Sequence, residues 1–113
     1  FFDSDTAYRN SNSIRINESG VYIVVGSVTW QSTGKTGLFG LGIRNVTDGD
    51  WVALDRNYYA ASDQGMIHNC IGVLSISSPK DVRLEASQYD YSGGVSIYRG
   101  ADFSPWLAAV RIA

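Results

Sequence analysis

The sequence predicts an all-β domain built as an antiparallel sandwich of two sheets. Short runs of β-branched and aromatic residues alternate with clusters of Gly, Ser, Asn and Asp about every ten residues. Evenly spaced short strands of this kind are typical of sandwiches and barrels. No stretch repeats apolar residues at the three-and-four spacing of an amphipathic helix. About eight short strands in a chain of this length favour a two-sheet jelly roll over an immunoglobulin domain, whose Cys…Trp…Cys pattern is absent.

The first half of the chain contains four predicted strands, at residues 13–16, 21–30, 38–46 and 51–59. A polar turn at 17–20 ends the first. The second is apolar at both alternating sets of positions, so we expect both of its faces to be covered, one by the opposite sheet and one by something else. Gly40 and Gly42 within the third indicate a bulge or a close backbone approach. The turn at 47–50 then leads into the fourth.

Four more strands are predicted in the second half, at residues 66–76, 82–91, 95–98 and 106–112. Pro79 marks the end of the first of these strands, because proline has no backbone N–H to donate to a ladder. The strand at 82–91 alternates cleanly, with apolar side chains such as Leu84 expected in the core and charged ones such as Glu85 on the opposite face. Ser92-Gly93-Gly94 is typical of a hairpin turn. The apolar run at 106–112 supplies the closing strand.

Composition argues against a nucleic-acid binder, a membrane-spanning helix and a disulfide-bonded domain. Nine Lys and Arg against eleven Asp and Glu give a net charge of −2, and the basic residues are scattered, unlike the basic face of a nucleic-acid binder. No apolar run approaches the roughly 20 residues of a membrane-spanning helix. The single cysteine, Cys70, excludes an internal disulfide, and its apolar neighbours indicate a small buried hydrophobe. Residues 1–113 fit one domain, and the opening Phe1-Phe2 without a signal peptide suggests a C-terminal fragment of a longer protein.

Three segments, taken in order, resemble complement C1q-like domains. Residues 18–24, Glu-Ser-Gly-Val-Tyr-Ile-Val, resemble the turn and first long core strand of that family. Residues 81–88 with the following Ser92-Gly93 resemble its penultimate core strand and turn, and residues 103–107, Phe-Ser-Pro-Trp-Leu, resemble its closing segment. The chain is shorter than the vertebrate members between Trp30 and Val82 and contains less Phe. It therefore looks more like the bacterial and bacteriophage members that end collagen-like or fibre-like stalks.

The resemblance implies a ten-stranded jelly roll of the tumour-necrosis-factor-like type, packed as a homotrimer in an extracellular, cell-surface or virion location. The residues add their own support, because the alternation of charged positions in 82–91 continues into Tyr89 and Tyr91, which a lone subunit would leave outside its core. We expect a trimer interface that contains Tyr22, Tyr89, Tyr91 and Trp106. The alternative is that Tyr89 and Tyr91 are ordinary half-exposed residues near a turn.

Aromatic residues near loops are the candidates for ligand binding. Trp51, Tyr58 and Tyr59 flank the segment 48–63, where Asp63 adds a hydrogen-bonding group. An aromatic ring stacked on a sugar, beside polar side chains, would suit a carbohydrate ligand. The alternative is that Trp51 anchors the core and the two tyrosines pack between subunits.

Acidic residues in the turn at 47–50 are the candidates for metal binding. Asp48 and Asp50 could offer carboxylate oxygens to calcium, which prefers oxygen ligands on loops. The alternative is that they are ordinary turn residues, because Asp and Gly are common in turns. No other cofactor is expected.

Two further patterns suggest chemistry only superficially. Gly34-Lys35-Thr36 lacks the earlier glycine and the helix of a phosphate-binding loop. His68 and Cys70 share a strand face, but no orienting acid is recognisable near them, and no pair of carboxylates stands out for glycoside hydrolysis. We therefore expect no enzyme.

The leading hypothesis is a homotrimeric head domain that assembles a fibre or surface protein and binds a cell-surface glycan or protein. The alternatives are a purely structural trimerisation cap and a monomeric carbohydrate-binding module.

Overall fold

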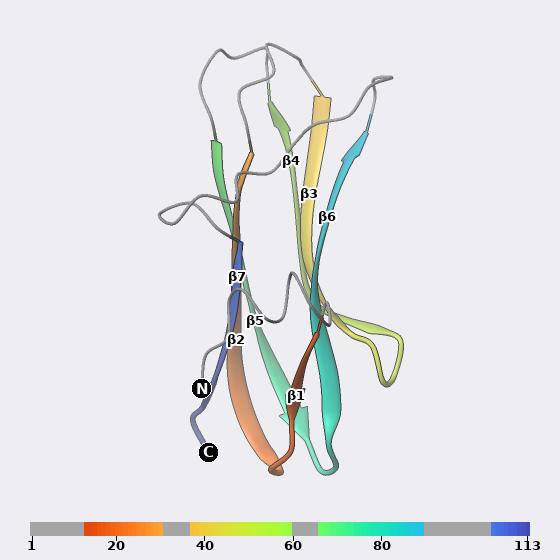
Figure 1. Ribbon diagram of the computed structural model, residues 1–113, viewed down its shortest axis with the longest axis vertical. Coiled ribbons are helices and arrows are strands. Elements are labelled where there is room, and N and C mark those ends of the chain that lie inside the picture. Colours follow the sequence, from red (N-terminus) through yellow and green to blue (C-terminus); the bar gives the residue numbers. More distant parts are fainter. Residues whose placement is uncertain (1–12, 31–36, 60–65, 90–104) are drawn as a thin grey trace.

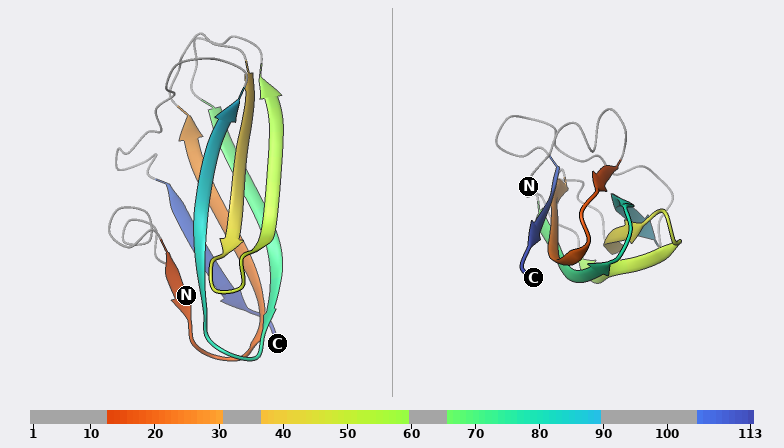
Figure 2. Two further views of the ribbon diagram at one scale, coloured as in Figure 1. Left: turned by 90° about the vertical axis from the view of Figure 1, so that its right-hand side faces the viewer. Right: turned by 90° about the horizontal axis from the view of Figure 1, so that it is seen from below.

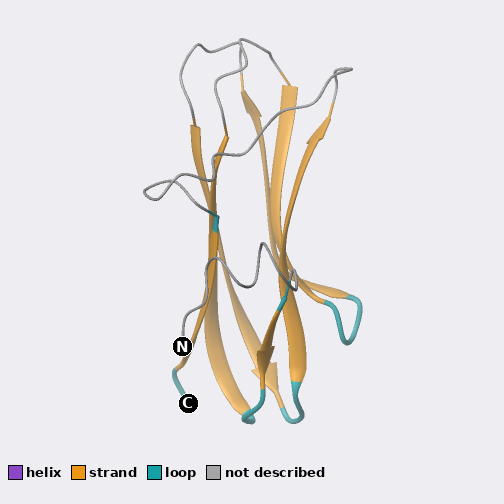
Figure 3. Cartoon of the chain, viewed as in Figure 1, coloured by secondary structure: helices purple, strands orange, loops and turns teal. Residues whose placement is uncertain are grey.

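The computed structural model describes residues 13–30, 37–59, 66–89 and 105–113, which contain seven strands and no helix. The strands form a four-stranded sheet in the order β1-β6-β3-β4 and a three-stranded sheet in the order β5-β2-β7, both antiparallel. Figures 1 and 2 show the two sheets facing each other along the long axis of the molecule, and Figure 3 shows the turns between strands. The strand bounds are β1 Ile14–Ile16, β2 Gly20–Trp30, β3 Gly37–Asn45, β4 Asp50–Tyr59, β5 Met66–Ile76, β6 Lys80–Tyr89 and β7 Trp106–Arg111.

The prediction of an antiparallel β-sandwich is confirmed. Seven of the eight predicted strands occur within two residues of their expected bounds, and the eighth, at 95–98, lies outside the described residues. Among the residues that are described, no helix is long and apolar enough to cross a membrane.

Strand β2 is the central strand of the three-stranded sheet, and its sequence is apolar at both alternating sets of positions. It pairs with β5 along its whole length, from Gly20 opposite Ile76 to Trp30 opposite Met66, and with β7 on its other side. One alternating set of its side chains points into the sandwich and is buried. The other set lies on the outer face of the sheet, where Ile23 and Val25 are only partly covered.

The core lies between the two sheets and is almost entirely aliphatic and aromatic. Trp30 packs edge-on against Phe39 of the opposite sheet, with ring centroids 5.0 Å apart. Gly26 leaves room for Leu84, because a Cβ atom at this position would lie 2.4 Å from Leu84 Cδ1. The largest fully buried side chains are Ile16, Val24, Val28, Phe39, Leu41, Ile43, Val82 and Leu107.

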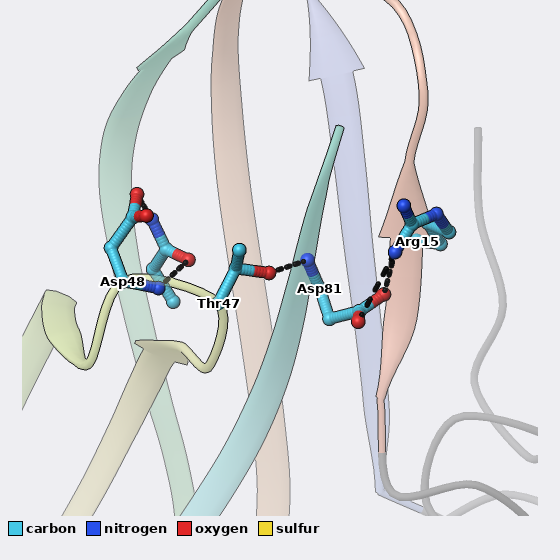
Figure 4. Close-up of polar contacts among 5 residues, drawn as sticks. Arg15, Thr47, Asp48 and Asp81 are labelled. Carbon is cyan, nitrogen blue, oxygen red and sulfur yellow. Dashed lines mark hydrogen bonds and ion pairs between the residues drawn. The ribbon is translucent and has the colours of Figure 1, made fainter. Parts of the chain in front are cut away.

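The turn between β3 and β4 is fastened to β6. Val46 N–H donates to the Asp81 carbonyl oxygen at 2.8 Å, and Asp81 N–H donates to Thr47 Oγ1 at 2.8 Å. The Asp81 carboxylate in turn accepts from the Arg15 guanidinium at 3.2 and 3.3 Å, which carries the connection on to β1 (Figure 4). Gly49 adopts a φ of 79°, a conformation that favours glycine.

Strand β4 contains a bulge near this turn. Ile43 pairs with Ala53, but Arg44 pairs with Trp51, so Val52 is an extra residue with no partner in the ladder. Bulges bend the strand that carries them. Figure 1 shows the β3–β4 hairpin turning away from the sheet at this end and projecting from the side of the sandwich.

Candidate assembly surface

The outer face of the β5-β2-β7 sheet carries two complete cross-strand rows of apolar residues. One row is Val73, Ile23 and Val110, and the next is Ile71, Val25 and Ala108. Ile71 and Val73 are 67% and 65% exposed, and Val110 is 53% exposed. We call these six residues, with the exposed Ile67 on β5 and Ile112 after β7, the apolar face.

An apolar face of this kind is unusual on the outside of a sandwich. When one face of a sheet is in water, residues along each strand normally alternate between apolar side chains toward the core and polar side chains toward the solvent. Strands β2 and β5 instead carry apolar residues on both faces. Soluble monomers rarely expose contiguous apolar patches larger than a few hundred Å². The apolar face therefore has the chemical character of a surface that another protein surface covers.

The expected interface residues are only partly on this face. Trp106 is on it, because it pairs with Ser27, which has the same strand parity as Ile23 and Val25. Tyr22 is not: it is 5% exposed, points into the core and donates its hydroxyl to the Glu18 carbonyl oxygen at 2.8 Å. The expectation for Tyr22 is therefore corrected, because its position on β2 has the core-facing parity.

The other two expected interface residues are not brought to the apolar face. Tyr89 ends β6 in the four-stranded sheet, where its backbone pairs with Leu38. Tyr91 lies outside the described residues. Members of the apolar face that were not expected at an interface include Ile67, Ile71 and Val73 on β5, although β5 shows the same signal as β2, apolar residues at both parities.

A buried chain of hydrogen bonds joins the two sheets beside the core. Trp30 Nε1–H donates to His68 Nδ1 at 3.3 Å, and His68 Nε2 lies 2.6 Å from Asp55 Oδ2. Because an indole nitrogen can only donate, Nδ1 accepts, and the proton of the neutral imidazole is on Nε2, from which it is donated to Asp55. His68 is 2% exposed, whereas the Asp55 side chain is 44% exposed.

The expectation that no acid lies near His68 is wrong, because Asp55 is within hydrogen-bond distance of it. Asp55 comes from β4 in the opposite sheet, 13 residues away in sequence, so local spacing could not reveal it. The arrangement still does not activate Cys70, because Nδ1 faces Trp30 and Nε2 faces Asp55. Burial, with a smaller contribution from the Asp55 charge, raises the pKa of the Cys70 thiol to about 11, so the thiol stays protonated at neutral pH.

A shallow pocket opens to solvent beside Asp55, along the seam between β4 and β5. Its volume is about 280 Å³, and the residues that line it are Ala53, Leu54, Asp55, Asn69, Cys70 and Ile71. Both strands are sheet edges in the described part of the fold. Water in this pocket can reach the Asp55 carboxylate but not the buried imidazole behind it.

The expected ligand-binding aromatic residues are spread along β4. Trp51 lies near the start of β4, where it pairs with Arg44 of β3. Tyr58 is seven residues further on, which places the two residues about 23 Å apart along the strand. Tyr59 ends the strand opposite Gly37, and Asp63 lies outside the described residues. The structure therefore does not bring Trp51 and the tyrosines together. The alternative of Trp51 as a core anchor is wrong, because Trp51 is 44% exposed.

The expected calcium ligands are engaged as turn residues. Lys80 Nζ donates to Asp48 Oδ1 at 2.9 Å, and Asn45 Nδ2 donates to Asp48 Oδ2 at 2.8 Å. The hydrogen bond from Lys80, and then that from Asn45, hold the pKa of the Asp48 carboxyl below its usual value. The Lys80 ammonium group therefore already occupies the Asp48 carboxylate oxygen that a calcium ion would need. Asp50 is exposed, and no group of three or more His, Cys, Asp or Glu capable of holding a metal occurs in the described ranges.

Comparison with known proteins adds no relative. None of the protein-family models matches the chain, and no curated protein is significantly similar to it.

Proposed function

We propose that the chain is a non-catalytic head domain that assembles with copies of itself through the apolar face. The observation that carries the proposal is the pair of apolar rows on the outer side of the β5-β2-β7 sheet, with Ile71 and Val73 each about two-thirds exposed. A second copy is the occupant we propose, because a disulfide-free domain of 113 residues gains stability from assembly.

The magnitudes agree with self-association. Full burial of a Val or Ile side chain is worth about 1.5–3 kcal/mol, so covering the exposed part of each is worth roughly 1–2 kcal/mol. The five most exposed members of the apolar face therefore contribute roughly 5–10 kcal/mol per copy when covered. Association costs about 4–15 kcal/mol in lost freedom, which one apolar face barely offsets. Two faces that cover each other contribute roughly 10–20 kcal/mol against one such cost, and three contribute roughly 15–30 kcal/mol against two, so the balance favours association over most of the range.

We propose three copies, and a jelly roll of the tumour-necrosis-factor-like type, on the resemblance to C1q-like domains. Three apolar faces turned toward a common axis would cover one another and leave the four-stranded sheets outermost. Such a head would end a fibre or surface protein in an extracellular, cell-surface or virion location. It would also present three copies of any ligand site on the outer sheets, which multiplies a weak affinity for a glycan or protein on a cell surface.

Two alternatives differ in what they require of the apolar face. A purely structural cap needs the same assembly but no ligand. A monomeric carbohydrate-binding module would leave the apolar face in water, which the exposure of Ile71 and Val73 disfavours.

Light scattering coupled to size-exclusion chromatography tests the assembly. We expect the protein at micromolar concentration to have three times the chain mass of 12.3 kDa. Ile71→Glu places a charge in one of the two cross-strand rows of the apolar face and should yield monomers. Leu54→Glu is the matched control, because Leu54 is a similarly placed apolar residue, 45% exposed, on the other sheet. A monomeric wild-type protein, or an Ile71→Glu variant of unchanged mass, would refute the proposal.

A further inference from the structure

The bulge in β4 decides which face Trp51 occupies. In an unbroken register Trp51 would pair with Asn45, whose side chain is buried, and would itself face the core. The extra residue Val52 shifts the pairing by one, so that Trp51 pairs with Arg44 on the outer face of the four-stranded sheet. A one-residue shift moves a side chain to the opposite side of a sheet, and bulges often serve to re-aim a side chain. The fold thus contains an irregularity whose result is an exposed tryptophan.

Gly42 provides the seat for this tryptophan. A Cβ atom at position 42 would lie 2.5 Å from Trp51 Cζ3 and 3.1 Å from Leu54 Cδ1, so only glycine lets the indole lie against the strand. The Arg44 guanidinium carbon is 5.1 Å from the centre of the Trp51 ring system, within cation–π range. Arg44 also donates to the Gly49 carbonyl oxygen at 3.5 Å. The ring is therefore held in place while 44% of the residue stays exposed.

Polar groups border the indole on the side of β6. Glu85 pairs with Gly42 and Arg83 pairs with Arg44, so both are on the same outer face as Trp51. Arg83 Nη2 donates to Glu85 Oε2 at 2.6 Å, and both side chains remain about one-third exposed. Neighbouring strands are about 4.8 Å apart, and the indole lies over Gly42, which pairs with Glu85, so the Arg83–Glu85 pair is on the strand next to the one that seats the ring.

We propose that Trp51, seated on Gly42 and bordered by the Arg83–Glu85 pair, binds a neutral hexopyranose unit of a glycan. The C–H face of the sugar ring would lie on the exposed part of the indole that neither Gly42 nor Arg44 covers. The Glu85 carboxylate would accept from a hydroxyl group, and Arg83 would donate to another. This inference rests on the ligand-binding part of the proposed function and names its site and ligand class. It does not depend on self-assembly, because the site and the apolar face belong to different sheets.

The surroundings of Trp51 favour a sugar over larger partners. A typical protein interface covers about 800 Å² and 20–30 residues on each side. In the described part of the chain, the other exposed large apolar residues on β4 and the turn before it are Leu54 and Val46. Single-stranded nucleic acid needs a positively charged groove beside its stacking residues. Here Glu85 neutralises Arg83, and the chain has a net charge of −2.

Titration followed by ¹⁵N–¹H NMR of the indole and backbone N–H groups tests the site in the 113-residue chain, and the backbone signals report binding in variants that lack the Trp51 indole. The probes are the methyl β-D-pyranosides of glucose, galactose, mannose and N-acetylglucosamine. We expect at least one to shift the Trp51 signal saturably, with a dissociation constant of about 1 mM, while the buried Trp30 signal stays fixed. Trp51→Ala should weaken binding at least tenfold. Trp51→Phe keeps a ring and should lose less.

Two further variants separate the site from the fold. Gly42→Ala should displace the indole and weaken binding by a similar factor, with the mass by light scattering unchanged. Glu85→Gln keeps an acceptor and should bind better than Glu85→Ala. If none of the four glycosides shifts the Trp51 signal, or if Trp51→Ala binds as tightly as wild type, the proposal is wrong and Trp51 is better explained as a protein contact. A monomer that still binds sugar would refute only the assembly.

Discussion

Removal of the Asp55 carboxylate tests the buried hydrogen-bond chain between the sheets. In Asp55→Ala, the Nε2–H of His68 loses its acceptor while the imidazole stays 2% exposed. A hydrogen bond to a charged group is worth about 1.5–3 kcal/mol. Because Asp55 itself is 44% exposed and already hydrated in part, we expect the lower end of this range, a loss of about 1.5–2 kcal/mol in the free energy of unfolding. Asp55→Asn keeps an oxygen acceptor without the charge and should lose about half as much.

Urea unfolding followed by tryptophan fluorescence measures these losses, since Trp30 is itself a member of the hydrogen-bond chain with His68. All variants should be compared at one protein concentration, because assembly makes apparent stability depend on concentration. The midpoint should fall while the dependence on urea stays constant. The interpretation fails if Asp55→Ala is within about 0.5 kcal/mol of wild type, the spread of ordinary surface substitutions. It also fails if Asn and Ala at position 55 are equally destabilising.

Two further predictions concern titratable groups. Because the pKa of Asp48 is lowered in the folded protein, its contribution to stability is present above its usual value of 3.8 and is lost as the pH falls through the folded value. Asp48→Asn and Lys80→Ala should therefore flatten the acid side of the stability curve below about pH 4, and unchanged steepness in urea midpoints measured across that range would contradict this. The Cys70 pKa of about 11, against 9.0 for a free thiol, leaves roughly a hundredfold less thiolate at pH 8. Native protein should react with Ellman's reagent about a hundredfold more slowly than urea-unfolded protein, and equal rates would show that the thiol is accessible.

The strands could be predicted from sequence because their ends carry local signals. Gly20 and Pro79 mark the turns that bound β2, β5 and β6, and the alternation of β-branched residues marks the strands between them. The expectation that β2 has two covered faces is met on the core side, where Tyr22 and Val24 are buried. On the outer side Ile23 and Val25 remain partly exposed, so that half of the expectation stays a prediction.

The positions of single side chains could not be predicted in the same way. A strand that is apolar at both parities does not reveal which set faces the core, so Tyr22 was assigned to the wrong side. The bulge at Val52 depends on how β3 and β4 pair, and one unpaired residue reverses the face of Trp51. The contact of His68 with Asp55 crosses between sheets, where sequence spacing carries no information.

The order of the three-stranded sheet has a consequence for synthesis of the protein. Its central strand finds its partners late, since Gly20 pairs with Ile76 and Tyr22 pairs with Arg111. The β3–β4 hairpin can close early, but β2 must wait until β7 has left the ribosome, and pairing across such separations is slow. An interrupted chain cannot complete the apolar face. In the proposed assembly, only copies that include β7 would be competent to join one another, so the fold itself would exclude unfinished chains.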